Sequence, residues 1–455
     1  MSTALGAPAP AGGTAWTPAA EAERVMSAFV SPVAGIVRRI FERTRDTDDL
    51  YAYSVGSEAC DSRIVLGTAC NQVNGGGGPS RQGAWLAAVG ETVERYSGAW
   101  VPFDLLEYGT RRELSGRGLE CLSPDDYTPF ADWQYDRPDA DHVRFTEQTW
   151  IPWVQSRRLG DGALVWIPAQ PVYLRADLMD VNPVAYATSN GLAYGSTEDE
   201  ALVGALLELV ERDAVMLAWY KALSMPLIDP ASDPGVAAYL ERHVAPTGCR
   251  ASLVDLSVFT GVSTVLAVVR NDVPGAVPLG LGAAADASPA RAATKAVAEA
   301  VSTRSWAVAK RRAGIRVDPD SDFDETVRTF DDHIALYAGG ELTGQTRFLD
   351  ASAERSSLGD MPRLPSDGPG ELRDALVSLL ARAGIDLYAV DLTSPDVREA
   401  GGRVVRVFSP QLRALDAGYR RRLLGGERLH ARPAELGLVE PGAQDYVNPD
   451  PHPFP

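Results

Sequence analysis

The segment from Ala201 to Tyr220 constrains the fold most, because it is apolar on nearly every side of a helix. Ser196 or Thr197 is placed to cap this helix, which we expect to run from Glu198 to about Lys221. A helix that is apolar all round belongs inside a protein. Four charged residues nevertheless interrupt it: Glu208, Glu211, Arg212 and Asp213. Since a buried carboxylate without a partner is costly, something must compensate these charges.

The same Glu-x-x-Glu-Arg pattern occurs earlier, as Glu91, Glu94 and Arg95. Residues three apart share a helix face, so each copy sets two carboxylates side by side. Mg²⁺ prefers oxygen ligands and usually takes one or two carboxylates together with substrate phosphates. A single copy is most often a solvated helix face, but recurrence after two glycine-containing loops favours Mg²⁺ holding a nucleotide. A looser third copy, with Lys295, Glu299 and Arg304, follows the segment Gly280–Ser288.

The rest of the chain alternates strands and helices, which indicates an α/β fold. Near the N-terminus we expect a helix over Glu21–Arg45 interrupted at Ser31-Pro32, a strand over Arg63–Thr68, a glycine loop over Asn71–Arg81 and a helix through Trp85 to Tyr96. Further strands are expected over Ala163–Val172, Leu253–Leu256, Ser263–Val269, Leu387–Val390 and Arg403–Phe408, with helices over Pro289–Arg312 and Glu371–Ala383. Gly280–Ala285 is expected to be a loop or the end of a strand.

Composition excludes several classes of protein. A formal net charge of −18 argues against nucleic acid and anionic lipid as partners, because both need clustered Lys and Arg. The four cysteines are far apart and form no CxxC pair, so neither a zinc ribbon nor a disulfide framework is expected. No signal peptide or membrane-length apolar run is present, which favours a cytoplasmic protein. Walker, GxGxxG, HExxH and GxSxG motifs are all missing.

Three segments carry a resemblance to a known family. GGGGPSRQGAWLAAVGETVERYS, SNGLAYGSTEDEALVGALLELVERDA and AATKAVAEAVSTR resemble the nucleotide-binding segments of YcaO-domain proteins, and VDLTSPDVREAGGRVVRVFSPQL and the closing PHPFP are similar as well. The resemblance implies a YcaO-type α/β fold, with mixed sheets, packed helices and repeated loop–helix elements that bind ATP. It implies Mg²⁺ and phosphate-bridging roles for Glu91, Glu94, Glu208 and Glu211, and places Ser189, Asn190, Arg212, Glu299 and Arg304 in the nucleotide pocket.

The resemblance also implies a reaction. A Cys, Ser or Thr side chain of a ribosomal precursor peptide adds to the preceding amide carbonyl, and the oxyanion attacks the γ-phosphate of ATP. Loss of phosphate leaves a thiazoline or oxazoline. A proline-rich C-terminus resembles that of azoline-forming cyclodehydratases, which implies catalytic roles for Pro451, Pro453 and Pro455. We therefore expect a disordered tail over 1–20, a catalytic domain over 21–447 and a tail that reaches the active site over 448–455.

Family members of this type imply several partners. These are a leader-bearing precursor peptide, a leader-binding protein resembling a ubiquitin-activating enzyme or a winged-helix module, a flavin-dependent azoline dehydrogenase and a second copy of this chain. Two alternatives stay open: a YcaO enzyme that forms a thioamide or an amidine, and a non-catalytic scaffold that binds ATP. Ala87 and Gly77 favour the scaffold, since many members carry Ser and Lys at these positions.

Overall fold

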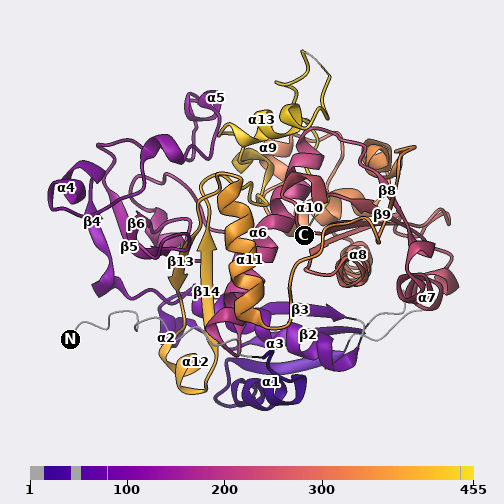
Figure 1. Cartoon of the computed structure of the whole chain (residues 1–455), viewed down its shortest axis with the longest axis horizontal. Helices are drawn as coiled ribbons and strands as arrows, with labels where there is room; N and C mark the ends of the chain where they lie inside the picture. Colours follow the sequence, from indigo (N-terminus) through magenta and orange to yellow (C-terminus); the bar gives the residue numbers. More distant parts are fainter. Residues whose placement is uncertain (1–14, 43–52, 79, 441, 455) are drawn as a thin grey trace.

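The computed structural model describes residues 15–42, 53–78, 80–440 and 442–454, and the strands within them form three sheets (Figure 1). The first is antiparallel in the order β1 (Val37–Glu42), β2 (Tyr53–Ala59), β3 (Val73–Gly78). The second has the order β4 (Glu107–Gly109), β5 (Ile151–Arg158), β13 (Tyr388–Asp391), β14 (Arg403–Phe408), β7 (Leu192–Gly195), with β6 (Leu164–Pro168) paired to β5. The third has the order β11 (Leu279–Ala285), β10 (Thr264–Arg270), β9 (Arg250–Asp255), β8 (Leu227–Asp229), β12 (Arg355–Ser357).

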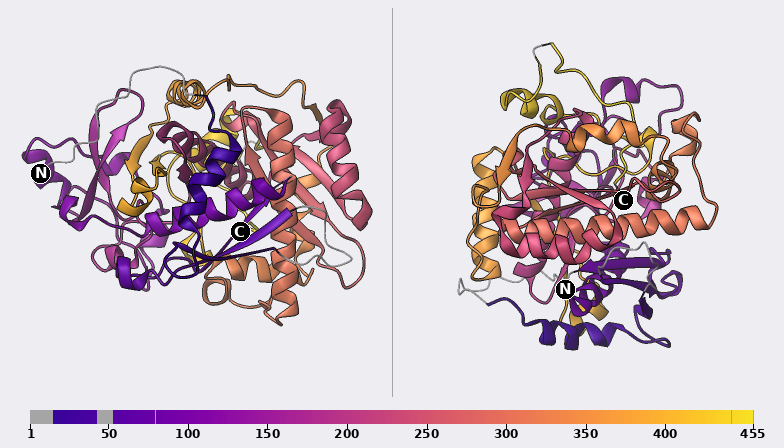
Figure 2. Two further views of the ribbon diagram at one scale, coloured as in Figure 1. Left: turned by 90° about the horizontal axis from the view of Figure 1, so that it is seen from below. Right: turned by 90° about the vertical axis from the view of Figure 1, so that its right-hand side faces the viewer.

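Each sheet ends in an edge strand that leads directly into a long helix. Strands β3, β7 and β11 are followed by α3 (Arg81–Gly98), α6 (Glu198–Tyr220) and α8 (Pro289–Arg312). The packing is cyclic, because α3 contacts β3 and β7, α6 contacts β7 and β11, and α8 contacts β11 and β3. The right-hand view of Figure 2 shows the N-terminal sheet lying beside α8. Three sheet edges and three helices therefore meet around one centre.

Glycine in the edge strands permits this packing. A Cβ on Gly76 would lie 2.4 Å from the backbone nitrogen of Ala88 in α3, and one on Gly282 would lie 2.2 Å from that of Ala300 in α8. Such distances are shorter than real contacts, so each helix backbone rests directly on its strand. The glycine run therefore forms a strand that accommodates a helix.

The helix starts follow local sequence signals. The Thr197 hydroxyl accepts a hydrogen bond from the N–H of Glu200 and caps α6, and Ser80 does the same for α3 through the N–H of Gly83. The other helices are α1 (Ala19–Met26), α2 (Arg63–Leu66), α4 (Arg111–Gly116), α5 (Asp132–Tyr135), α7 (Pro234–His243), α9 (Phe323–Thr326), α10 (Phe330–Ala338), α11 (Pro369–Arg382), α12 (Pro395–Glu399) and α13 (Arg428–Glu435).

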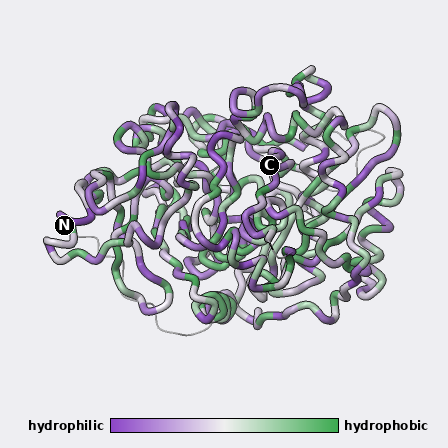
Figure 3. The backbone as a smooth tube through the Cα atoms, turned by 90° about the horizontal axis from the view of Figure 1, so that it is seen from above, coloured by the Kyte–Doolittle hydropathy of each residue, from purple (hydrophilic) through white to green (hydrophobic). Residues whose placement is uncertain are grey.

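The core follows the apolar helix α6. Its second half, which includes Trp219 and Tyr220, packs with the C-terminal Phe454 in one buried cluster, while its first half packs against α11 and β14 in another. Many peripheral loops are hydrophilic, as the purple segments of Figure 3 show. Among the described residues, none of the helices combines the length and apolar character needed to cross a membrane. All four cysteines are described, and each is a free thiol.

Several expectations from the sequence were wrong. Residues 21–26 are helical as expected, but 37–42 form strand β1, because this segment pairs antiparallel with β2, a partner that is remote in the sequence. Residues 63–66 form helix α2 and expose Ile64 and Val65 instead of forming a strand. The glycine loop contains strand β3, and Gly280–Ala285 lies within the full strand β11. Residues 43–45, at the end of the first predicted helix, lie outside the described residues.

Candidate functional site

Five glutamates converge where the three sheet edges meet, and each accepts a hydrogen bond from a backbone N–H in or beside an edge strand. Within the repeated units, Glu91 accepts from Gly75 at 3.3 Å, Glu208 from Gly191 at 3.0 Å and Glu299 from Ala283 at 2.9 Å. Between the units, Glu94 accepts from Tyr194 at 2.8 Å, and Glu211 accepts from Ala285. An edge strand has unpaired N–H groups, and these carboxylates satisfy four of them, together with the N–H of Gly191 just before β7.

Arg212 is the cation that joins three of these carboxylates. Its guanidinium lies 3.3 Å from Glu211, 3.7 Å from Glu299 and 3.9 Å from Glu208. On α3, Arg95 lies 3.1 Å from Glu91. The exposed fractions of the Arg212 and Glu211 side chains are only 15% and 13%, so these charges have limited access to water.

The site carries more negative charge than the protein compensates. Burial raises the pKa of Glu94 to about 8, against 4.5 for a free carboxyl, and the nearby Glu208 and Glu91 contribute to the rise. Burial also raises the pKa of Glu208, Glu211 and Glu299, although Arg212 opposes the rise in each case. Protons held at neutral pH by buried carboxylates are replaced readily by a metal ion, which offers more positive charge.

Arg406, which sequence reasoning did not select, belongs to this site together with Arg95 of the first Glu-x-x-Glu-Arg pattern. Arg406 is 4% exposed on β14, its Nη1 donates to the Thr188 carbonyl, and its positive charge opposes the rise in the pKa of Glu208. Its Nε, together with Nε and Nη1 of Arg95, is buried with no hydrogen-bond partner among the described residues. The available signal was an arginine inside the apolar strand Arg403–Phe408, since a buried guanidinium needs a partner.

The other predicted site residues occupy different surroundings. Asn190 is buried, and both ends of its amide bond the backbone of Leu415, at 2.8 and 3.1 Å. The Ser189 carbonyl accepts from the Leu192 N–H in the turn before β7. Arg304 is 1% exposed and its Nε donates to the Val277 carbonyl. The described residues thus bring Glu91, Glu94, Glu208, Glu211, Arg212 and Glu299 together.

The C-terminal segment is buried in the protein. Pro451, His452, Pro453 and Phe454 are all buried, and they form neither helix nor strand, as the prolines predicted. Pro455 lies outside the described residues.

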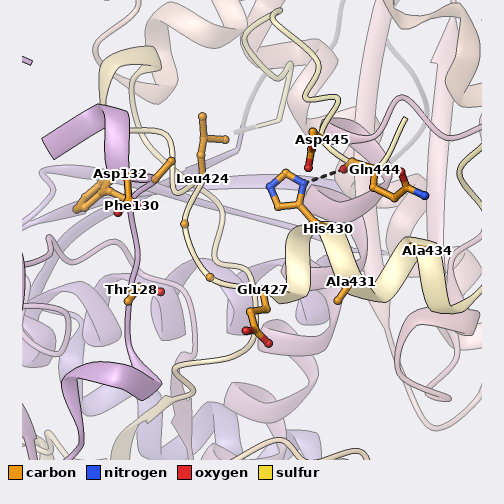
Figure 4. A pocket seen from close by; sticks show the side chains of 13 residues that line it. Thr128, Phe130, Asp132, Leu424, Glu427, His430, Ala431, Ala434, Gln444 and Asp445 are labelled. Atoms are coloured by element: carbon orange, nitrogen blue, oxygen red, sulfur yellow. Dashed lines mark hydrogen bonds between the residues drawn. The ribbon is translucent and has the colours of Figure 1, made fainter. Parts of the chain in front are cut away.

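A cavity of about 670 Å³ lies apart from the glutamates. It is bounded by residues 128–132, by 424–434 including α13, and by Gln444 and Asp445 (Figure 4). Its lining includes the apolar side chains of Phe130 and Leu424 and the carboxylates of Asp132, Glu427 and Asp445. None of the five glutamates lines it.

Comparison with known proteins adds a family to this geometry. Residues 75–413 match the family model described as YcaO cyclodehydratase, ATP- and Mg²⁺-binding. The match covers most of the chain and all five glutamates.

This chain belongs to the YcaO family.

A protein of Methanothermobacter thermautotrophicus, itself uncharacterised, is 26% identical to this YcaO chain over 350 residues, which cover 74% of the chain and 80% of that protein. A Rhizobium leguminosarum bv. trifolii protein from the tfuA 3′ region is 33% identical over 36% of the chain and 41% of its own length.

Solved structures share the fold. A heterocyclase in complex with substrate and cofactor has a TM-score of 0.77 at 23% identity; the match covers 98% of this chain and 59% of that one. The chain therefore spans less than two thirds of the heterocyclase. YcaO from Methanopyrus kandleri, bound with AMPPCP and Mg²⁺, has a TM-score of 0.61 at 21% identity, with 86% and 88% coverage. The expected YcaO-type fold is confirmed.

ATP and Mg²⁺ are the cofactors of the YcaO domain, and the residues of this chain fit them. Carboxylate oxygens are the donors that Mg²⁺ prefers, and the partnerless N–H groups of Arg95 and Arg406 suit phosphate oxygens. Within the described ranges, no three His, Cys, Asp or Glu side chains are grouped to hold one ion. Each ion would therefore take one or two of the glutamates and complete its coordination with phosphate and water.

Proposed function

We propose that this YcaO chain is an ATP-dependent peptide cyclodehydratase, which converts Cys, Ser or Thr of a ribosomal precursor peptide into thiazoline or oxazoline rings. The observation that carries the proposal is the convergence of five glutamates and Arg212 at three sheet edges. Transfer of a phosphoryl group requires positioning and neutralisation of phosphate charge, and this site provides both. Supporting it, solved proteins with this fold include heterocyclases.

The reaction proceeds in two stages. The substrate side chain adds to the carbonyl carbon of the preceding amide, and the resulting oxyanion takes the γ-phosphoryl group of ATP, which releases ADP. Elimination of inorganic phosphate then leaves the ring with a C=N bond. Mg²⁺ neutralises the phosphate charge when bound. In this chain Glu91, Glu94, Glu208 and Glu211 would hold the metal, while Arg212, Ser189, Asn190, Glu299 and Arg304 would orient the nucleotide directly or through neighbouring backbone.

The proposal includes a role for the chain end and for partners. We assign residues 21–447 to the catalytic domain and 448–455 to a segment whose Pro451, Pro453 and Pro455 support catalysis. A chain of the E. coli microcin synthetase McbBCD complex shares the fold, with a TM-score of 0.53 at 14% identity, and this supports the proposal that the present chain also acts in a complex. We expect this chain to act in the cytoplasm as a homodimer, in complex with a leader-binding protein. A flavin-dependent dehydrogenase would then act on the azoline product.

Mass spectrometry of a precursor peptide tests the proposal. The peptide is incubated with the chain, its leader-binding partner, ATP and Mg²⁺, and ADP is measured in parallel. We expect the peptide mass to fall by one water per modified residue, with one ADP formed for each. With Glu208→Ala we expect no change in peptide mass. Glu200→Ala is the matched control, because Glu200 lies on the same helix but bonds the N–H of Ser196 outside the cluster.

Other outcomes identify the alternatives. A mass gain that reflects sulfur in place of oxygen would indicate a thioamide, and a macrocyclic product would indicate an amidine. An unchanged peptide mass, although ATP and the leader are shown to bind, would refute the cyclodehydratase activity. The non-catalytic ATP-binding scaffold would then be the function that is left.

A further inference from the structure

The last described residues are held by side chains rather than by a strand ladder. Prolines have no N–H, so this segment offers mainly carbonyl groups to the fold. Three successive carbonyls each accept one hydrogen bond: Asp450 from Trp219 Nε1 at 3.2 Å, Pro451 from the Tyr337 hydroxyl at 2.6 Å, and His452 from His333 Nδ1 at 2.7 Å. Trp219 lies in the last turn of α6, and the other two donors lie on α10.

His333 has one tautomer that fits its surroundings. The ring is fully buried, and its Nε2 accepts the N–H of Gly418 at 3.2 Å. Nδ1 must then carry the proton that is donated to the His452 carbonyl. A neutral ring with this tautomer satisfies both neighbours, whereas the other tautomer would set two donors against each other and leave the carbonyl unsatisfied.

His452 continues the same arrangement. Its ring stacks on that of His333, with centroids 4.1 Å apart and an interplanar angle of 13°. Its Nδ1 accepts the N–H of Phe454 at 3.3 Å, so its Nε2 donates to the Asp416 carbonyl at 2.8 Å. The two rings therefore fix the backbone of the segment up to Phe454.

The segment lies against the helix that carries two of the glutamates. The N–H of Asn448 donates to the Tyr220 carbonyl at 2.7 Å, at the C-terminal end of α6. Phe454 packs edge-on against Trp219, with centroids 6.3 Å apart. Trp219 is eight residues after Glu211, which corresponds to about 12 Å along a helix. The segment is therefore attached to the same helix that carries Glu208 and Glu211.

We infer that His333 is a positioning residue, which sets the place of residues 451–454 relative to α6 through its hydrogen bond and its stacking on His452. His333 acts through the segment and touches neither nucleotide nor peptide. The inference rests on the proposed function only where activity is the readout, because the hold on the segment is measurable without a substrate.

The test uses hydrogen–deuterium exchange and steady-state kinetics on the full chain. His333→Phe keeps a ring but removes the donor, His333→Asn restores a donor, and Tyr337→Phe removes only the neighbouring hydroxyl. The matched control is His142→Phe, because His142 also stacks on an aromatic ring, Phe130, but lies elsewhere. A variant that lacks residues 451–455 gives the activity of the enzyme when the segment is absent.

We expect exchange of the C-terminal peptide to accelerate about tenfold or more in His333→Phe, as for a lost hydrogen bond to a buried carbonyl, with the remaining peptides unchanged. The kcat should fall toward that of the deletion variant while KM for ATP stays near wild type, and His333→Asn should recover part of both effects. Unchanged C-terminal exchange in His333→Phe would overturn the inference. If His333→Phe does not fold, Tyr337→Phe takes its place. Unchanged exchange of the C-terminal peptide in that variant would refute the claim that side chains of α10 hold the segment.

Activity separates this inference from the proposed function. If the wild type modifies no peptide, the proposed function fails while exchange still decides the hold on the segment. If the segment loosens in His333→Phe but kcat stays at the wild-type value while the deletion variant is inactive, the positioning role is refuted.

Discussion

Replacing Glu94 by Gln should stabilise the protein without its ligands, and more strongly as the pH rises. The pKa of Glu94 is about 8 in the fold and 4.5 in a free carboxyl, so between these values the unfolded chain loses a proton that the folded chain keeps. The folded state is then penalised by about 2 kcal/mol at pH 6 and about 5 kcal/mol at pH 9. These are upper limits, because relaxation of a partly buried site lowers such costs.

Gln removes the penalty but keeps the shape. Its side-chain oxygen still accepts the N–H of Tyr194, which Glu94 binds at 2.8 Å. Urea unfolding of ligand-free wild type and variant at pH 5, 6 and 9 measures the effect as a difference in midpoint, which we expect to increase with pH. Glu200→Gln is the control, since it removes an acidic charge at the start of α6 and should destabilise slightly, by about 0.5–1 kcal/mol.

One result would refute the reasoning. A midpoint for Glu94→Gln at pH 9 that is no higher than that of wild type would mean that the carboxylate is well compensated without ligand. The excess negative charge at the three sheet edges would then be no argument for a cation site. Weaker Mg²⁺-dependent ATP binding by the same variant, measured by calorimetry, is the expected functional counterpart.

Three further predictions follow from the packing. Gly76→Ala should destabilise by about 1–3 kcal/mol in thermal or urea unfolding, because its Cβ meets the α3 backbone, whereas Gly75→Ala, whose Cβ has nothing within 3.6 Å, should be nearly neutral. Asp213→Ala should cost about 3–5 kcal/mol, since it leaves the partly buried Arg428, whose side chain is 12% exposed, without the carboxylate at 2.6 Å; a loss below 1 kcal/mol would contradict this. Burial lowers the pKa of His333 well below 6.5, so its contribution to stability is complete above pH 6.5 and decreases as the pH falls below that value, which a series of acid unfolding midpoints for wild type and His333→Phe would reveal.

That acid dependence has a defined set of charged neighbours. The ring of His333 faces His452 from the C-terminal segment and the positive charge of Arg422 from the preceding loop, while Asp416 lies beyond His452. Protonation of His333 at Nε2 would place a second positive charge near Arg422. The new N–H at Nε2 would then face the N–H of Gly418, so that two donors oppose each other. Equal slopes of midpoint against pH for wild type and His333→Phe would contradict the assignment.

The sequence predicted the parts of the site that depend on helices. The spacing of Glu208 and Glu211 and the cap at Thr197 were sufficient to place α6, because these signals act over one or two helical turns. The family resemblance assigned Glu91 and Glu299 to the same nucleotide site as these two glutamates. The structure brings both to the centre that holds Glu208 and Glu211, while their roles toward Mg²⁺ and nucleotide stay predictions.

The strands were harder to predict, because their partners are remote in sequence. Glycine usually indicates a loop, but Gly76 is required where α3 rests on β3, and this contact is invisible in a single local segment. Arg406 went unnoticed for a similar reason, since only the pairing of β14 with β7 brings it toward Glu208. The surroundings of Asn190 show the same limit, because its amide bonds the backbone of Leu415, 225 residues later in the chain, and no local pattern indicates that contact.

The meeting of three sheet edges sets limits on useful recombinant fragments. A fragment cut at residues 75 and 413, where the family match begins and ends, would remove β1 and β2 and leave β3 without its antiparallel neighbour. It would also remove Phe454 from the cluster around Trp219. The newly exposed strand edge and apolar surface favour aggregation. For this protein, therefore, the region that defines the family is smaller than the unit that can be expected to fold.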